Sequence, residues 1–168
     1  GMATAALQGA NDLLAAPREP KRAKEMEYGT ADQGLAAQVR ALIKFERWDE
    51  ILKPGTIEWR DTEEAKALRA IVETMAYAGQ GKPVDARSRL SETKELFHAL
   101  AEEFKALAPP GEVFASVELI AAEGLICAAE GNLLDATRFL TEAAAIEKKQ
   151  RDAHQYPNDP PNAAWPVN

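Results

Sequence analysis

Two stretches of the chain share one spacing of small and large residues around a glycine. The shared positions are Tyr77, Gly81, Ala86 and Leu90 in the first stretch, and Gly124, Gly131, Ala136, Leu140 and Ala143 in the second. Small residues where two helices cross let their axes approach near the short end of the usual range of about 8–10 Å. One such hairpin cannot bury its apolar faces alone, so it must stack on neighbours. The spacing therefore predicts stacked antiparallel helical hairpins.

A third turn position aligns with these two glycines. Glu46 precedes Gly81 by 35 residues, and Gly131 follows Gly81 by 50 residues. Repetition at intervals of this size is typical of helical repeat arrays. The first of the three units departs most from the pattern, because the bulky residues Val39 and Ile51 occupy its crossing positions.

Apolar residues recur with the period of a helix and no stretch alternates as a strand does, so the sequence predicts an all-α fold of six or seven helices. The expected helices cover about residues 4–16, 31–45, 48–52, 62–78, 83–107, 112–129 and 133–154. Asp61 and Glu64 are spaced as a reciprocal N-terminal cap, and Pro83 suits the first turn of the next helix. We expect one helical domain over 1–155 and a proline-rich, irregular C-terminal tail over 156–168.

At these residues the chain resembles the tetratricopeptide-repeat (TPR) family, over roughly residues 31–149. The third unit carries small and large residues where the family's motif has them. In the second unit, Thr74 and Thr93 stand where the family favours small residues. The segments 44–52 and 156–161 also look like parts of longer bacterial proteins of this repeat type. The resemblance implies a short, degenerate or truncated TPR-like α-solenoid that binds protein partners.

The resemblance also implies a partner groove lined by the first helix of each hairpin. The family's groove positions correspond to Gln33, Ala36, Arg40, Ile43 and Lys44 in the first unit, Leu68, Ile71, Met75 and Ala78 in the second, and Glu118, Ala121, Leu125 and Ala128 in the third. Arg40 and Lys44 form a small basic end that can hold a carboxylate through charge-assisted hydrogen bonds. The rest is largely apolar, which predicts either helix-in-groove recognition or occlusion by the chain's own N-terminal helix.

Residues that could carry catalysis or bind a metal are scarce. The chain has two histidines, His98 and His154, and one cysteine, Cys127, and their spacing matches no metal-binding motif. Cys127 takes the position that Tyr77 holds in the second unit, so we expect a buried small apolar residue. We expect no metal, no cofactor and no enzymatic activity. An enzyme acting through His98 is the weakest alternative, and it requires a polar pocket that buries His98.

Charge and composition bear on partners and location. The net charge is −7, from 20 basic and 27 acidic residues, which disfavours binding to nucleic acid and to anionic membrane surfaces. No apolar run approaches the roughly 20 residues that span a bilayer, and the first residues lack the pattern of a secretory signal. A single cysteine fits a reducing compartment. We therefore expect a cytoplasmic protein whose partners are proteins.

Two functions from different classes fit these features. The first is an interaction or scaffold module that binds a peptide or protein segment in the groove. The second is a structural protein that associates with itself, with a symmetric dimer covering the open end near the last helix and tail. A solution mass that stays monomeric at every concentration would exclude the second function.

Overall fold

The structure is a computed structural model of the chain, and it describes residues 1–15, 30–105 and 117–153. Within these ranges there are seven helices and no β-strand, which confirms the all-α prediction. For residues 30–33, 103–105 and 150–153 only the backbone is described, and the predicted tail and His154 lie outside the described residues. None of the described helices is both long and apolar enough to cross a membrane.

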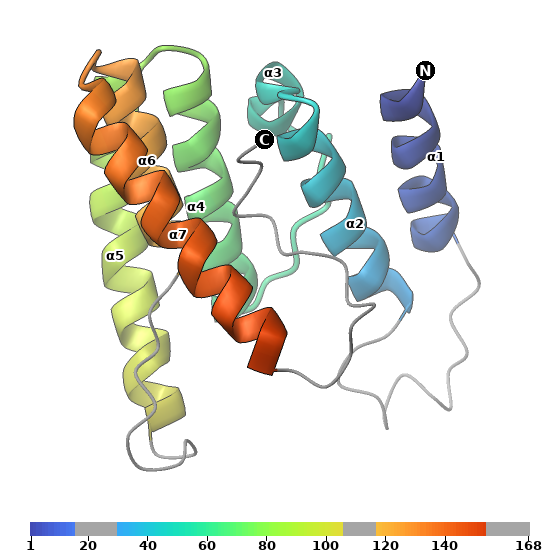
Figure 1. Cartoon of the computed structure of the whole chain (residues 1–168). Helices are drawn as coiled ribbons and strands as arrows, with labels where there is room; N and C mark the ends of the chain where they lie inside the picture. The colour runs from blue at the N-terminus through green and yellow to red at the C-terminus, as the bar shows by residue number, and fades with distance from the viewer. Residues whose placement is uncertain (16–29, 106–116, 154–168) are drawn as a thin grey trace. The chain divides into compact units, whose positions relative to one another are not determined.

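The helices belong to two compact units, residues 1–58 and 59–168. Unit 1 contains α1 (Met2–Ala15), α2 (Thr30–Lys44) and α3 (Trp48–Leu52). Unit 2 contains α4 (Glu63–Gly79), α5 (Pro83–Lys105), α6 (Val117–Ala129) and α7 (Leu133–Ala153) (Figure 1).

In unit 1, α2 packs against α1 along its length and then turns tightly into α3. A Cβ atom placed on Gly34 would lie 2.9 Å from Cγ of Leu14 and 3.0 Å from its backbone nitrogen. The two helices therefore approach so closely at Gly34 that any larger residue would collide with α1. Val39, Leu42 and Ile51 are among the buried core residues of this unit.

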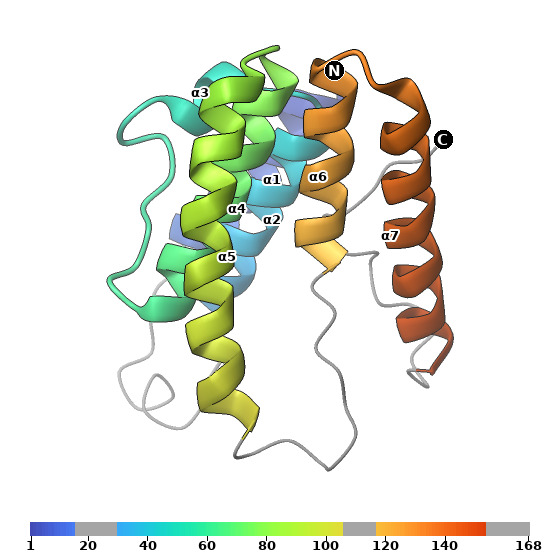
Figure 2. The ribbon, with the colours of Figure 1, turned by 90° about the vertical axis from the view of Figure 1, so that its left-hand side faces the viewer.

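Unit 2 consists of two helical hairpins, α4–α5 and α6–α7, and α6 packs against both helices of the first hairpin. Figure 2 shows α7 on the side of α6 that faces away from α5. Alanine is unusually frequent among the fully buried residues, which include Ala70, Ala76, Ala86, Ala122 and Ala143. Because alanine projects little beyond the backbone, a core of this kind holds helices close together.

The three turn positions aligned in the sequence share one backbone geometry. Glu46, Gly81 and Gly131 all have positive φ angles, of 52°, 70° and 81°. In each turn the following residue donates its backbone N–H to the carbonyl five residues earlier, as from Lys82 to Tyr77 at 2.9 Å. This bond satisfies a carbonyl at the end of the first helix, and a left-handed residue is the usual way to form it. The sequence alignment thus corresponds to three turns of the same form.

The α6–α7 crossing is as close as the small-residue spacing predicts. A Cβ atom on Gly124 would lie 2.7 Å from Cγ of Leu140 and 3.3 Å from the carbonyl oxygen of Ala136. Gly124 and Ala136 are both buried. Glycine is therefore required at this point of α6 by the position of Leu140 on the neighbouring helix.

The α4–α5 crossing uses a pair of threonines at two of the same positions. Thr74 aligns with Gly124 and Thr93 with Ala143, and the two hydroxyl oxygens lie 3.2 Å apart in the fully buried interior. Each hydroxyl is also 2.8 Å from the backbone carbonyl four residues earlier in its own helix. Since each hydroxyl has one proton, one threonine donates across the crossing while the other donates to its own helix. The pair thus satisfies its polar groups where the sequence pattern favours small residues.

The N-terminal cap of α4 lies one residue later than predicted. Thr62, not Asp61, is the capping residue, and its Oγ1 accepts a hydrogen bond from the backbone N–H of Ala65 at 3.2 Å. Glu63 and Glu64 then fall in the first turn, where the helix dipole favours acidic side chains. The prediction that Pro83 starts the next helix is confirmed by α5.

Candidate functional site

Two of the candidate catalytic residues, His98 and Cys127, lie within the described part of the chain. None of the described residues form a group of three or more His, Cys, Asp or Glu side chains placed to hold a metal ion. Cys127 is buried, as predicted. His98 is exposed on α5, whereas the hypothesis of an enzyme acting through His98 required a polar pocket that buries it. The structure therefore gives this hypothesis no geometric basis.

The predicted groove positions of unit 1 lie on α2. Ala36 and Arg40 are partly exposed, Lys44 is exposed, Ile43 is buried, and the side chain of Gln33 is outside the described residues. Arg40 and Lys44 are one helical turn apart, so they project from the same side of α2. Within the described part of the chain, neither has an acidic partner.

Half of the predicted groove positions of unit 2 belong to the core. The buried members are Ile71, Met75 and Ala78 on α4 and Ala121 on α6. The accessible members are Leu68 on α4 and Glu118, Leu125 and Ala128 on α6. A partner can therefore reach this face only through the second set. An apolar pattern in the sequence does not separate the two sets, because both belong to the same helical stripe.

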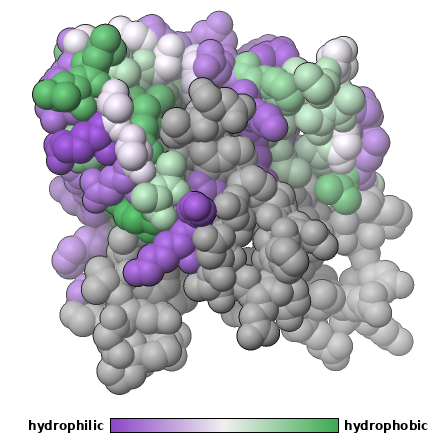
Figure 3. All heavy atoms as spheres, in the orientation of Figure 1, coloured by the Kyte–Doolittle hydropathy of each residue, from purple (hydrophilic) through white to green (hydrophobic). Residues whose placement is uncertain are grey.

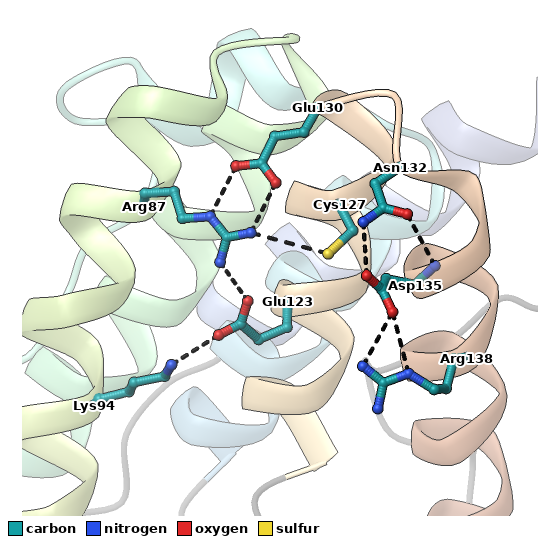
Figure 4. Close-up of polar contacts among 8 residues, drawn as sticks. All are labelled: Arg87, Lys94, Glu123, Cys127, Glu130, Asn132, Asp135 and Arg138. Carbon is teal, nitrogen blue, oxygen red and sulfur yellow. Dashed lines mark hydrogen bonds and ion pairs between the residues drawn. The ribbon is translucent and has the colours of Figure 1, made fainter.

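A network of charged side chains joins α5 to α6 (Figure 4). The guanidinium of Arg87 donates to both carboxylate oxygens of Glu130, at 2.9 and 2.8 Å, and to Glu123 at 2.6 Å. Lys94 donates to the other oxygen of Glu123 at 2.8 Å. Arg87 also lies 3.9 Å from the sulfur of Cys127. Two basic residues of the α4–α5 hairpin thus form ion pairs with two acidic residues of the α6–α7 hairpin.

The network shifts the acid–base behaviour of its members. Burial of Glu123 opposes its ionisation, but the hydrogen bonds and charges of Lys94 and Arg87 outweigh burial, so the pKa of Glu123 is lowered. The hydrogen bonds from Arg87 lower the pKa of Glu130. The same bond to Glu130 is the main cause that raises the pKa of Arg87. Glu123, Glu130 and Arg87 are therefore charged at neutral pH.

Sequence reasoning missed this network, although a signal was present. Arg87 and Lys94 are seven residues apart, and so are Glu123 and Glu130. A spacing of seven places each pair on one face of its helix, two turns apart. Matched spacing of opposite charges on two helices indicates that these faces meet, but the sequence does not say which helices are neighbours.

A second charged cluster lies within the α4–α5 hairpin. Glu73 of α4 accepts from Arg89 of α5 at 2.8 Å and from Arg69 of its own helix at 2.7 Å. Arg89 also pairs with Glu92. Because these side chains are already committed to one another, we regard the cluster as part of the hairpin rather than as a binding site.

Three large apolar side chains are exposed at the starts of α5 and α7. The exposed fractions are 81% for Val84, 69% for Leu133 and 83% for Leu134. Figure 3 shows hydrophobic surface over the end of unit 2 where α7 begins. Adjacent exposed leucines are unfavourable in water, and a patch of this type often marks a contact with another molecule.

Within its described residues the chain thus forms short helical hairpins, with the basic residues Arg40 and Lys44 towards the end of α2 and two exposed leucines at the start of α7. Comparisons with protein-family models, with curated proteins and with solved structures give no match.

Proposed function

We propose that this chain is a non-catalytic interaction module, built from TPR-like helical hairpins, that binds a peptide or protein segment. The observation that carries the proposal is the repetition of one turn geometry at Glu46, Gly81 and Gly131, because a repeated hairpin is the unit of helical repeat arrays. The close α6–α7 crossing at Gly124 agrees with the proposal. The accessible residues Leu125 and Ala128 on α6 supply part of the binding face.

A selection experiment tests the proposal. The full chain is used as bait for a displayed library of random peptides, and enriched peptides are synthesised and titrated. We expect a related set of peptides with micromolar affinity, and Ala128→Asp should weaken their binding at least tenfold because a carboxylate then meets an apolar ligand.

Ala99→Asp is the matched control, because Ala99 is also an exposed helical alanine of unit 2 but lies on α5. Its binding should stay within about twofold of the wild type, and circular dichroism should show both variants folded. The proposal fails if no peptide is enriched over the support alone, or if the two variants lose binding equally.

A second candidate function is self-association, and the exposed leucines at the start of α7 favour it. If a symmetric dimer covers this patch, sedimentation velocity should show a mass that rises with concentration. The double change Leu133→Lys and Leu134→Lys should then keep the chain monomeric, whereas Val84→Lys, at the start of α5, should not. A wild-type mass that stays monomeric at every concentration rules this function out.

A further inference from the structure

We infer that α1 is a replaceable occupant of a helix-docking face on α2, and that this face favours a partner helix with acidic residues in its first two turns. The inference deepens the proposed interaction function and rests on it, since it names a partner class for the predicted groove residues Arg40 and Lys44. It involves α1 and α2, which both belong to unit 1.

The contact of α1 with the rest of unit 1 is a single narrow stripe. Every described side chain of α1 is largely exposed except four, which are Ala3, Leu7, Ala10 and Leu14. Their spacing of four, three and four residues is that of a coiled-coil seam, which is the narrowest apolar stripe that packs two helices. Only Ala10 is fully buried, and Met2 and Leu13 remain exposed. A helix held through so few buried groups gains little stability from its position.

The described residues of α1 and α2 also make no polar side-chain contact with one another. Among the described residues, the side-chain hydrogen bond made by α1 joins Gln8 to Asp12 within α1 itself, at 2.8 Å. No side-chain hydrogen bond or ion pair in the described part of the chain joins α1 to α2. The α5–α6 contact differs, because Arg87 there binds two carboxylates of the neighbouring helix. Between the described residues, the attachment of α1 to α2 therefore rests on packing.

On the other side of the contact, α2 is shaped to receive a helix. Gly34 leaves room for the backbone of α1 at Leu14, and any side chain there would overlap it. Glycine within a helix is less favourable than alanine, because it loses more backbone freedom on folding. A glycine in α2 is thus unfavourable for the helix itself and useful only when another helix docks against it.

The basic residues of α2 lie in the half of the helix beside which α1 carries no charge. Leu14, at the end of α1, meets Gly34 near the start of α2, so the helices are antiparallel and the first turns of α1 lie towards the C-terminal half of α2 (Figure 1). That half carries Arg40 and Lys44, which have no acidic partner within the described residues. No residue from Met2 to Asn11 has a charged side chain.

A competing helix can supply the charges that α1 lacks. Glutamate or aspartate in its first two turns would lie near Arg40 and Lys44 and gain charge-assisted contacts. Acidic residues are also favoured at the N-terminal end of any helix by its dipole. Because residues 16–29 tether α1 covalently, a free helix must bind more tightly than α1 does in order to displace it. The complementary charges provide that advantage.

The first measurement uses the intact chain. Hydrogen exchange resolved by peptide should show that the amides of α1 exchange through openings that leave α2 protected, with at least tenfold less protection in α1. If α1 and α2 exchange together, α1 is an integral part of unit 1 and the inference is wrong.

The second measurement asks what can replace α1. A site for a specific protease is introduced between residues 19 and 25, and the cut protein is titrated with labelled peptides covering residues 2–15. One peptide has the native sequence, one carries Thr4→Glu, Ala5→Glu and Gln8→Glu, and one carries lysine at the same three exposed positions. We expect all three to exchange with α1, and the acidic peptide to bind at least tenfold more tightly than the lysine peptide at low salt.

Two protein variants control this result. In the double variant Arg40→Gln and Lys44→Gln, the preference for the acidic peptide should fall to about threefold or less. An acidic peptide could also bind more tightly because it forms more helix in solution, and that effect would persist in this variant. Gly34→Leu should abolish binding of every peptide while unit 2 stays folded. Unfolding of the cut protein, failure of the peptides to displace α1, or an equal affinity for the acidic and lysine peptides overturns the inference. If the inference fails, library peptides whose binding is weakened by Ala128→Asp would still support the proposed function.

Discussion

At the scale of single residues, the backbone geometry of the turns decides which side chains are tolerated. Gly81 and Gly131 meet a positive φ angle with the residue best suited to it, whereas Glu46 adopts the same conformation with a side chain. A residue other than glycine pays about 1–2 kcal/mol for the left-handed region. The first hairpin is therefore the one with strain in its turn.

Replacing Glu46 with glycine should stabilise unit 1. Relief of the left-handed strain exceeds the added entropy of glycine in the unfolded chain, so we expect a net gain of about 0.5–1 kcal/mol. The opposite change, Gly131→Ala, should cost about 1 kcal/mol because it introduces the same strain. Urea unfolding followed by circular dichroism measures both. A loss of stability in Glu46→Gly would show that the glutamate side chain makes a contact worth more than the strain.

Gly124 should tolerate substitution poorly, because its Cβ position is occupied by Leu140. In Gly124→Ala the new methyl group overlaps Leu140, and overpacking of this kind costs about 1–3 kcal/mol. Gly9→Ala is the control, because a Cβ at Gly9 has no neighbour within 4 Å and should stabilise α1 slightly. When Leu140 is first replaced by alanine, Gly124→Ala should cost almost nothing further. Equal costs in both backgrounds would contradict the proposed overlap.

At the scale of helices, the α5–α6 network should make the contact between the hairpins depend on pH. The pKa values of Glu123 and Glu130 are lowered in the folded chain, so their contribution is complete above the ordinary carboxyl pKa of about 4.5 and is lost as the pH falls further. Arg87→Met removes the shared partner of both carboxylates. We expect it to cost about 1 kcal/mol at pH 7 and less at pH 3.

The measurement is urea unfolding of the wild type and of Arg87→Met at both pH values and at two salt concentrations. High salt should reduce the difference in unfolding free energy between the wild type and Arg87→Met, since salt screens partly exposed charges. Arg138→Met is the control, because among the described residues Arg138 pairs with Asp135 of its own helix and lies over the ring of Phe139. A pH-independent cost of Arg87→Met would mean that its aliphatic packing, not its charge, holds α5 to α6.

At the scale of the whole molecule, the single thiol reports the opening of unit 2. Cys127 is buried and is the chain's one cysteine, so a thiol reagent can reach it only when α6 becomes exposed. We expect labelling of the folded protein to be slower than that of the unfolded chain by a factor on the order of a hundred or more. Gly124→Ala should speed this labelling in proportion to its loss of stability. Fast labelling of the wild type would contradict the burial of α6.

Much of the local structure could be predicted from the sequence, but only part of the candidate site. Helical period and Pro83 located the helices, and small residues located the close crossing at Gly124. The cap was placed one residue early at Asp61, because both Asp61 and Thr62 are good capping residues and the backbone conformation selects between them. The groove positions on α2, α4 and α6 were predicted from a resemblance, and the structure buries two of them, Ile71 and Met75, in the core.

The sequence by itself determined the helices, the three turns and the crossing at Gly124, because the period of apolar residues, the freedom of glycine and the size of a side chain act within a few residues. The tertiary structure alone decided that Arg87 lies between Glu123 and Glu130, that Thr74 meets Thr93, and that α1 occupies the face of α2 at Gly34. These contacts depend on which helix surfaces meet, and that choice is set by the packing of the whole unit.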